Sequence, residues 1–334
     1  MHTGRSNDPI PGRVDAMTGQ QILVIGAGSI GRRHATNLSG LGARVGIYDV
    51  NTAAVRDFCK NTKVSAVSDL NRALDTGGYD AALVCTPNHL HISCAQAVAD
   101  AGLHLFIEKP LSHSPDGVDH LVSTVKKKGL LTMAGFNLRF EPGLRFIKTH
   151  LDPTQVAFAL IEFGSYLPEW RPGVDYRAVY SAQKSMGGGI ILDDVHELDY
   201  ACWLFGYPAA TRSGSGTFGA LEIDVEDVAD IQLHYPDKLI TIHTDYLQRT
   251  YTRRCKIVLK DGFAIEWVYG DHATFFSDAD ERTLRYRDTF SANDMYVDEM
   301  KEFLRCLEEG RAPESDLANA AAILKIALDA KKEW

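Results

Sequence analysis

Three polar clusters in the sequence carry the residue types of an acid–base site. Thr86-Pro87-Asn88-His89-Leu90-His91 and Glu108-Lys109-Pro110 each follow an apolar run, and Asp193, His196 and Asp199 recur at three-residue spacing. A lysine partly removed from water can stabilise an alkoxide as it forms, and a histidine beside a carboxylate can take up a hydroxyl proton. The clusters predict chemistry on an alcohol oxygen, with Lys109 and His196 as catalytic residues.

Each of these residues also has a purely structural explanation. Lys109 could be a surface lysine at the end of a strand, and His196 could be a hydrogen-bonded histidine of the core. Asp194 and Glu197 match a capping box, so these acids could serve only to start a helix. A zinc site is not expected, because no second histidine follows His196 at helical spacing.

A glycine-rich loop supplies a partner for this chemistry. Residues 22–31 read ILVIGAGSIG, and residues 32–41 have the pattern of a helix. Gly26 permits a tight turn, Gly28 lets the backbone approach a pyrophosphate, and Gly31 allows close packing of the helix on the strand. Asp49 follows Gly31 by 18 residues and would accept hydrogen bonds from the adenosine ribose. Since this acid would repel a 2′-phosphate, the loop predicts NAD rather than NADP.

The elements that would position these residues fall into two patterns. In the first, apolar strands alternate with helices, which predicts a doubly wound parallel α/β sheet of the Rossmann type with its crevice at the carboxyl ends of the strands. The predicted strands of this part are residues 22–25, 44–48, 79–85, 104–107 and 130–134, and the helices after the first are residues 89–101 and 114–128.

After Phe136 the strands become longer and the turns between them shorter, which predicts an α+β domain with a large, mostly antiparallel, open-faced sheet. These strands are residues 156–163, 227–235, 239–246, 254–259 and 263–269, with helices at 295–307 and 315–332. We therefore expect a disordered extension over residues 1–19, an NAD-binding Rossmann domain over 20–136, and a domain for substrate binding and oligomerisation over 137–334.

Composition excludes several classes of protein. The 334 residues carry a formal net charge of −9 without a basic stripe, which argues against nucleic acid as a partner. The sequence has no apolar run near the roughly 20 residues that a membrane helix needs. The six cysteines are scattered without a Cys-x-x-Cys pair, which is typical of reduced thiols, and we expect a cytoplasmic protein.

Together, these motifs resemble the Gfo/Idh/MocA family, named after glucose–fructose oxidoreductase, inositol dehydrogenase and MocA. The glycine loop, Thr86-Pro87-Asn88, Glu108-Lys109-Pro110 and the segment from Gly187-Gly188-Gly189 to His196 occur in the family's order and spacing. The resemblance implies that Lys109 and His196 are catalytic and that Asn88 and Glu108 lie beside the nicotinamide ribose. The cofactor-binding candidates within the matching motifs are Gly26, Gly28, Ser29, Ile30, Gly31, Asp49, Thr86, Pro87, Asn88, His91, Glu108, Lys109 and Asn137.

The sequence departs from the family near the histidine. Many members carry an aspartate four residues before it, where this chain has Leu192. We predict Asp193 as the third catalytic residue, on one helix face with His196, while Asp194 stays open as the alternative. The segment 136–140 resembles the crossing between the domains, and residues 170–177 would form a loop over the crevice. The substrate-binding candidates are Arg139, Trp170, Arg171, Tyr176, Arg177 and Asp199.

The loop arginines indicate an anionic substrate, although each could equally be a solvated loop residue. The sequence is also similar to family members associated with bacterial surface-glycan pathways. We predict an NAD-dependent oxidoreductase acting on a secondary alcohol of a sugar, polyol or nucleotide sugar, as a homodimer or homotetramer. The alternatives are an epimerase or glycosidase that recycles its NAD, and a regulator that senses the dinucleotide without chemistry.

Overall fold

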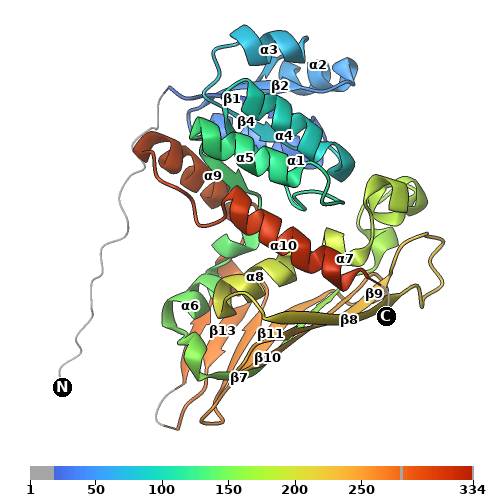
Figure 1. Cartoon of the computed structure of the whole chain (residues 1–334), viewed down its shortest axis with the longest axis vertical. Coiled ribbons are helices and arrows are strands. Elements are labelled where there is room, and N and C mark those ends of the chain that lie inside the picture. Colours follow the sequence, from blue (N-terminus) through green and yellow to red (C-terminus); the bar gives the residue numbers. More distant parts are fainter. Residues whose placement is uncertain (1–18, 279–280, 333–334) are drawn as a thin grey trace.

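The first half of the chain forms a parallel six-stranded sheet. The structure, a computed structural model, describes residues 19–278 and 281–332, so the extension predicted for residues 1–19 lies outside it except for Gly19. The strand order is β3-β2-β1-β4-β5-β6, as predicted for a doubly wound fold (Figure 1). The strands are β1 (Gln21–Ile25), β2 (Arg44–Tyr48), β3 (Ser65–Ala66), β4 (Ala81–Val84), β5 (His104–Ile107) and β6 (Thr132–Ala134).

Helices connect these strands, and local signals mark where several of them begin. Asn51 and Asp69 cap two helices that we did not predict, each accepting a hydrogen bond from a backbone N–H three residues later. The helix expected from residue 114 begins instead at Val118, because Gly117 adopts a left-handed φ of 76°. The helices of this half are α1 (Ser29–Gly40), α2 (Thr52–Lys60), α3 (Leu70–Thr76), α4 (His91–Asp100) and α5 (Val118–Lys128).

The second half forms an eight-stranded sheet in the order β14-β13-β12-β11-β7-β10-β9-β8. All neighbouring strands pair antiparallel except β7 and β10, which confirms the mostly antiparallel prediction. Three of the strands, β8, β13 and β14, were not predicted. The strands are β7 (Val156–Gly164), β8 (Ala210–Gly216), β9 (Val228–His234), β10 (Leu239–Asp245), β11 (Thr252–Leu259), β12 (Ala264–Val268), β13 (His272–Phe275) and β14 (Arg282–Arg285).

A layer of helices lies on one face of this second sheet and beneath the first sheet, as Figure 1 shows. These are α6 (Pro142–His150), α7 (Ile190–Asp193), α8 (His196–Phe205) and α10 (Leu317–Ala330), while α9 (Ala292–Glu309) packs on α1. Within the two described ranges, no helix is long and apolar enough to cross a membrane.

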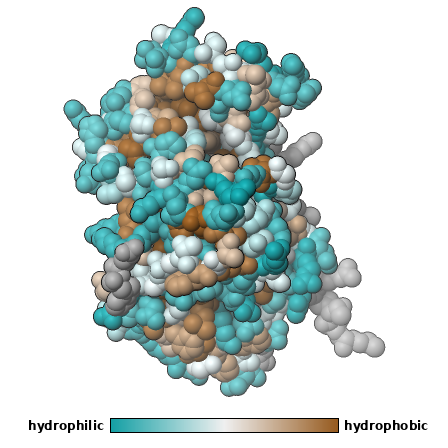
Figure 2. Space-filling model, turned by 90° about the vertical axis from the view of Figure 1, so that its right-hand side faces the viewer, coloured by the Kyte–Doolittle hydropathy of each residue, from teal (hydrophilic) through white to brown (hydrophobic). Residues whose placement is uncertain are grey.

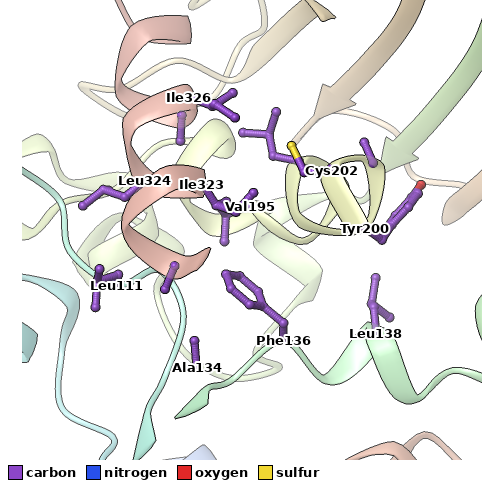
Figure 3. Close-up of a cluster of buried hydrophobic side chains, with 14 of the residues drawn as sticks. Leu111, Ala134, Phe136, Leu138, Val195, Tyr200, Cys202, Ile323, Leu324 and Ile326 are labelled. Atoms are coloured by element: carbon purple, nitrogen blue, oxygen red, sulfur yellow. The ribbon is translucent and has the colours of Figure 1, made fainter. Parts of the chain in front are cut away.

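One hydrophobic cluster runs through both sheets and fixes their relative position. Phe136, two residues after the end of β6, is 1% exposed and points toward Val195 before α8 and Ile323 on α10 (Figure 3). A second cluster joins α9 to the first sheet, with Met300, Phe303 and Leu304 buried in it. Packing at interior density resists rigid-body movement, so side chains from the two halves face each other in a defined geometry.

Candidate active site

A cavity of about 950 Å³ lies at the carboxyl ends of β1, β2, β4 and β5, where the parallel sheet meets the second half of the chain. Figure 2, a view from the side, shows apolar surface among polar residues at the level where the upper and lower parts of the molecule meet. All cofactor-binding candidates except Gly31 line the cavity, as do Lys109 and His196. The structure thus brings together motifs that span more than half of the sequence.

The glycine loop has the geometry that a dinucleotide needs. Gly26 has a φ of +108°, and a side chain there would place its Cβ 2.5 Å from the Cys85 carbonyl oxygen. A Cβ at Gly31 would lie 1.9 Å from the Gly26 oxygen, so Gly31 serves close packing although it does not line the cavity. At Gly28 the space is open, and no side chain caps the start of α1. The unpaired N–H groups there fit a pyrophosphate.

Asp49 closes the ribose end of the cavity. One of its carboxylate oxygens accepts a hydrogen bond from the Ala27 N–H at 2.7 Å, and the other accepts one from the Asn51 N–H at 2.8 Å. These bonds hold the acid against the glycine loop, and its side chain is half-buried at the cavity wall. A negative charge is therefore fixed beside the place of an adenosine ribose.

Lys109 bridges the two halves of the molecule. Its Nζ donates a hydrogen bond of 2.6 Å to the carbonyl oxygen of Asp193, the last residue of α7. Nearby, the Asn88 side chain donates to the Gly187 carbonyl oxygen at 3.2 Å. An ammonium group has three donors, so Lys109 retains N–H groups for a bound oxygen.

His196 lies at the start of α8, is 9% exposed and lines the cavity. Burial lowers the pKa of its imidazole well below the usual value, and the positive charges of Lys109 and Arg253 lower it further. The ring is therefore neutral near pH 7 and able to accept a proton. Its Nδ1 is buried and has no hydrogen-bond partner among the described residues.

The prediction that Asp193 and His196 share the face of one helix is wrong, and in the described part of the chain no hydrogen bond joins the His196 ring to an aspartate. The helix expected to carry both residues breaks after Asp193, and α8 begins at His196. The Asp193 carboxylate instead accepts a hydrogen bond from the Tyr246 hydroxyl at 2.6 Å. Its negative charge, followed by burial, raises the pKa of Tyr180, a tyrosine that lines the cavity.

Asp194 does not support the histidine either. Asp194 and Glu197 both bind the buried guanidinium of Arg253 on β11. The Glu197 oxygen lies 2.8 Å from the Arg253 Nε, and neither acid caps α8 with its side chain. The capping-box explanation is therefore wrong as well, because the two acids pair with a cation from the second sheet.

Of the substrate-binding candidates, the structure brings only Arg171 to the cavity. Arg139 and Asp199 form a buried bidentate ion pair, with an oxygen–nitrogen distance of 2.7 Å, and neither lines the cavity. Arg177 is exposed and is bound by Asp175 and Glu222. Two aromatic candidates support the loop instead. The indole N–H of Trp170 donates to Ser165 at 2.9 Å, and the Tyr176 hydroxyl accepts from the Glu222 N–H at 3.1 Å.

His91 lines the cavity, but its polar atoms are engaged elsewhere. Its ring nitrogens lie 2.8 Å from the Pro110 oxygen and 2.7 Å from the Thr86 oxygen, so the ring ties together the two polar loops. Several cavity residues were not predicted from the sequence, among them Arg33, Tyr180 and Tyr296. Arg33 stands next to the glycine loop, whereas Tyr296 reaches the cavity only because α9 folds back onto α1.

Comparisons with known proteins identify the family of the chain. A model of an oxidoreductase family with an NAD-binding Rossmann fold matches residues 20–136, and a model of the GFO/IDH/MocA C-terminal domain matches residues 156–265. The uncharacterized oxidoreductase YrbE of Bacillus subtilis is 30% identical over 57% of this chain and 55% of its own, so the chain matches about half of that relative's length.

Other relatives match over most of the chain. The myo-inositol 2-dehydrogenase of Thermotoga maritima is 26% identical over 93% of this chain and 95% of its own. The solved structure of levoglucosan dehydrogenase with NADH and levoglucosan has a TM-score of 0.83 and 19% identity, covering 93% of this chain and 97% of that one, which shows a shared fold. The chain belongs to the Gfo/Idh/MocA family of oxidoreductases, and its first half is the family's NAD-binding Rossmann domain.

Proposed function

We propose that this protein is an NAD-dependent dehydrogenase that acts on a secondary alcohol of a sugar, a polyol or a nucleotide sugar. The observation that carries the proposal is that Lys109 and His196, one from each half of the chain, line the same cavity as the glycine loop. The myo-inositol and levoglucosan relatives are named as dehydrogenases, which favours net oxidation over the recycling and regulatory alternatives.

In this mechanism the substrate hydroxyl lies between Lys109 and His196. The neutral imidazole of His196 accepts the hydroxyl proton, and the Lys109 ammonium donates a hydrogen bond to the oxygen as negative charge develops there. Bound NAD supplies the hydride acceptor for the hydrogen on the same carbon. Asp193 contributes through its carbonyl oxygen, which holds the Lys109 Nζ at 2.6 Å.

We expect His196→Ala and Lys109→Ala each to lower the rate of hydride transfer by about 10²–10⁴-fold, the usual effect of removing a positioned acid or base. The rate of the unaltered protein should fall as the pH drops through the His196 pKa, which lies below the ordinary histidine value, because a protonated ring cannot accept a proton. Single-turnover formation of NADH at saturating cofactor measures both effects across a panel of sugars.

Asp193→Asn is the matched control, since asparagine keeps the backbone carbonyl and a side-chain acceptor for Tyr246. It should retain most of the rate. Near-normal rates in both alanine variants would refute the catalytic assignment. Turnover of substrate without net NADH would favour the recycling enzyme, and NAD binding without turnover of any substrate would favour the regulator.

The charge of Asp49 should set the cofactor preference. We expect Asp49→Asn, which keeps an acceptor oxygen for the Ala27 N–H, to bind NAD about tenfold more weakly, since hydrogen bonds to charged groups contribute about 1.5–3 kcal/mol. The difference in affinity between NAD and NADP should become smaller, because the variant no longer repels the 2′-phosphate of NADP. Calorimetric titration with both cofactors measures the ratio, and tighter NADP binding by the unaltered protein would overturn the assignment.

Arg171 selects an anionic substrate in this proposal. Its guanidinium lies 5.3 Å from the centre of the Tyr180 ring at the cavity wall, and no described carboxylate pairs with it. The side chain is half-buried, so its charge is poorly compensated by water. A carboxylate or phosphate on the sugar, as in acidic sugars and nucleotide sugars, would neutralise the guanidinium charge through a bidentate contact.

Arg171→Ala should therefore raise KM for sugars that bear a carboxylate or phosphate by about 10–100-fold, the range for a lost charged hydrogen bond. Neutral sugars should be unaffected. Arg177→Ala is the control within the same loop, because that arginine is already paired with Asp175 and Glu222. Equal losses in both variants, or a neutral sugar as the best substrate with unchanged KM in Arg171→Ala, would contradict the assignment.

We further propose the domain boundary between residues 136 and 137 and a cytoplasmic homo-oligomer. The six cysteines are free, which supports a reducing compartment. Phe158, Leu160 and Leu239 are 39%, 50% and 37% exposed on the face of the second sheet opposite to the helix layer. Phe158 pairs with Leu239 in the sheet, so these side chains form adjacent apolar surface that a second copy would cover.

Light scattering at micromolar concentration should show a homodimer or homotetramer. Leu160→Asp, which places an unpaired charge on this face, should shift the protein towards monomers, because burying that charge is costly. Arg249→Asp, at an exposed position outside the sheet, serves as the control. A monomeric unaltered protein would refute the proposal.

A further inference from the structure

A second cluster of titratable side chains lies behind the cavity and has no part in the proton transfer described above. It joins three elements: His34 on α1, Glu108 after β5 and Glu299 on α9. His34 and Glu299 are fully buried and Glu108 is 7% exposed. One polar atom from each lies within 4.8 Å of the others.

Glu108 is held rigidly within this cluster. Its Oε1 lies 2.5 Å from the His34 Nε2, and its Oε2 accepts a hydrogen bond from the Lys109 N–H at 3.2 Å. On another side, a Cβ at Gly135 would come within 3.0 Å of the carboxylate, so the space for any rotation is small. The same carboxylate lines the cofactor cavity directly before the catalytic lysine.

Glu299, in contrast to Glu108, is not held by hydrogen bonds to the described residues. Neither of its carboxylate oxygens has a hydrogen-bond partner within residues 19–278 and 281–332, and no lysine or arginine of these ranges pairs with it. An ionised carboxylate that is buried and unpaired is strongly destabilising, so the neutral acid is the form that this environment favours.

The surrounding charges act in the same direction. Burial raises the pKa of the Glu299 carboxyl well above its usual value, and the negative charges of Glu108 and Asp199 raise it further. The other titratable neighbours include His34, the buried thiol of Cys85 and the Tyr296 hydroxyl. Burial, Glu108 and Glu299 raise the pKa of both the thiol and the hydroxyl. None of these neighbours is a permanent cation that would stabilise an ionised Glu299.

A metal ion is the other way to neutralise two acids and a histidine. The second ring nitrogen of a metal-bound histidine normally donates to an acceptor, whereas the buried Nδ1 of His34 has no partner in the described part of the chain. The His34 Nε2 is already engaged at 2.5 Å by Glu108. The arrangement therefore fits a proton shared between the His34 Nε2 and the Glu108 carboxylate better than a bound metal ion.

We propose that Glu299 is a positioning residue for the cofactor site, held as a neutral carboxylic acid behind His34 so that Glu108 carries the only negative charge of the cluster and stays oriented toward bound NAD. The proposal rests on the NAD site proposed above. Ionisation of Glu299 would set two carboxylates against each other in a buried space, and Glu108 would have to move or take up a proton.

The first test measures NAD affinity by calorimetry without substrate, so that its outcome is separate from that of the catalytic proposal. Glu299→Ala should weaken NAD binding about tenfold at pH 7, because the space left by the removed side chain lets the Glu108 carboxylate move out of its position. Glu299→Gln, a neutral side chain of the same shape, should restore binding to within about twofold of the unaltered protein. Glu302→Gln, on the same helix and paired with Arg311, is the control and should not change it.

The second test is the pH dependence of the same titration and of unfolding in urea. The affinity of the unaltered protein should fall with rising pH as Glu299 ionises, while that of Glu299→Gln stays flat. A folded-state pKa above the unfolded value also means that stability is lost as the pH rises between the two. The unfolding constant of the unaltered protein, relative to Glu299→Gln, should therefore rise up to about tenfold per pH unit above pH ~4.3.

Identical pH profiles of the unaltered protein and Glu299→Gln would overturn the proposal. So would a Glu299→Gln variant that binds NAD as poorly as Glu299→Ala, because a neutral isostere would then fail to replace the acid. A stoichiometric metal in the purified protein that disappears in Glu299→Gln would also overturn it and assign the cluster to a cation.

Discussion

The hydrogen bond from the Lys109 ammonium to the Asp193 carbonyl oxygen is the interaction on which the site depends. The break after α7 leaves this carbonyl at a helix end, where intrahelical partners are missing, and the lysine supplies the donor. The bond joins the carboxyl end of β5 to the segment that carries His196. The bond from Asn88 to the Gly187 oxygen makes a second bridge, from the loop after β4 to the turn before α7.

Hydrogen bonds between the two halves of the chain keep their geometry only if the two halves cannot move relative to each other. The shared hydrophobic cluster provides that restraint, because Phe136 lies at the crossing of the chain and contacts the layer of α8 and α10 (Figure 3). Helix α9 adds a restraint from the other direction by burying Phe303 against the first sheet. The cavity wall therefore contains Tyr296, a residue from the last sixth of the chain.

The sequence was sufficient to predict the features that depend on local residue patterns. The buried strands read as apolar runs, the glycine loop has one steric solution at Gly26 and Gly31, and the order of the parallel sheet follows from strand–helix alternation. Long-range partners were not predictable in this way. Asp199 and Arg139 have the residue types of a binding site, but each satisfies the other in the interior, 60 residues apart in sequence.

The same limit explains the error at Asp193. Regular spacing from Asp193 to Trp203 is compatible with one continuous helix, and only the tertiary structure shows that Arg253 on β11 binds Asp194 and Glu197 beside the break. That arrangement has an electrostatic consequence for the site. Burial lowers the pKa of His196 most, and Lys109 and Arg253 lower it further, so the cations that hold the broken helix in place also help to keep the imidazole neutral. The position and the protonation state of His196 thus both depend on the same two cations, and residue spacing in the sequence does not reveal these cations.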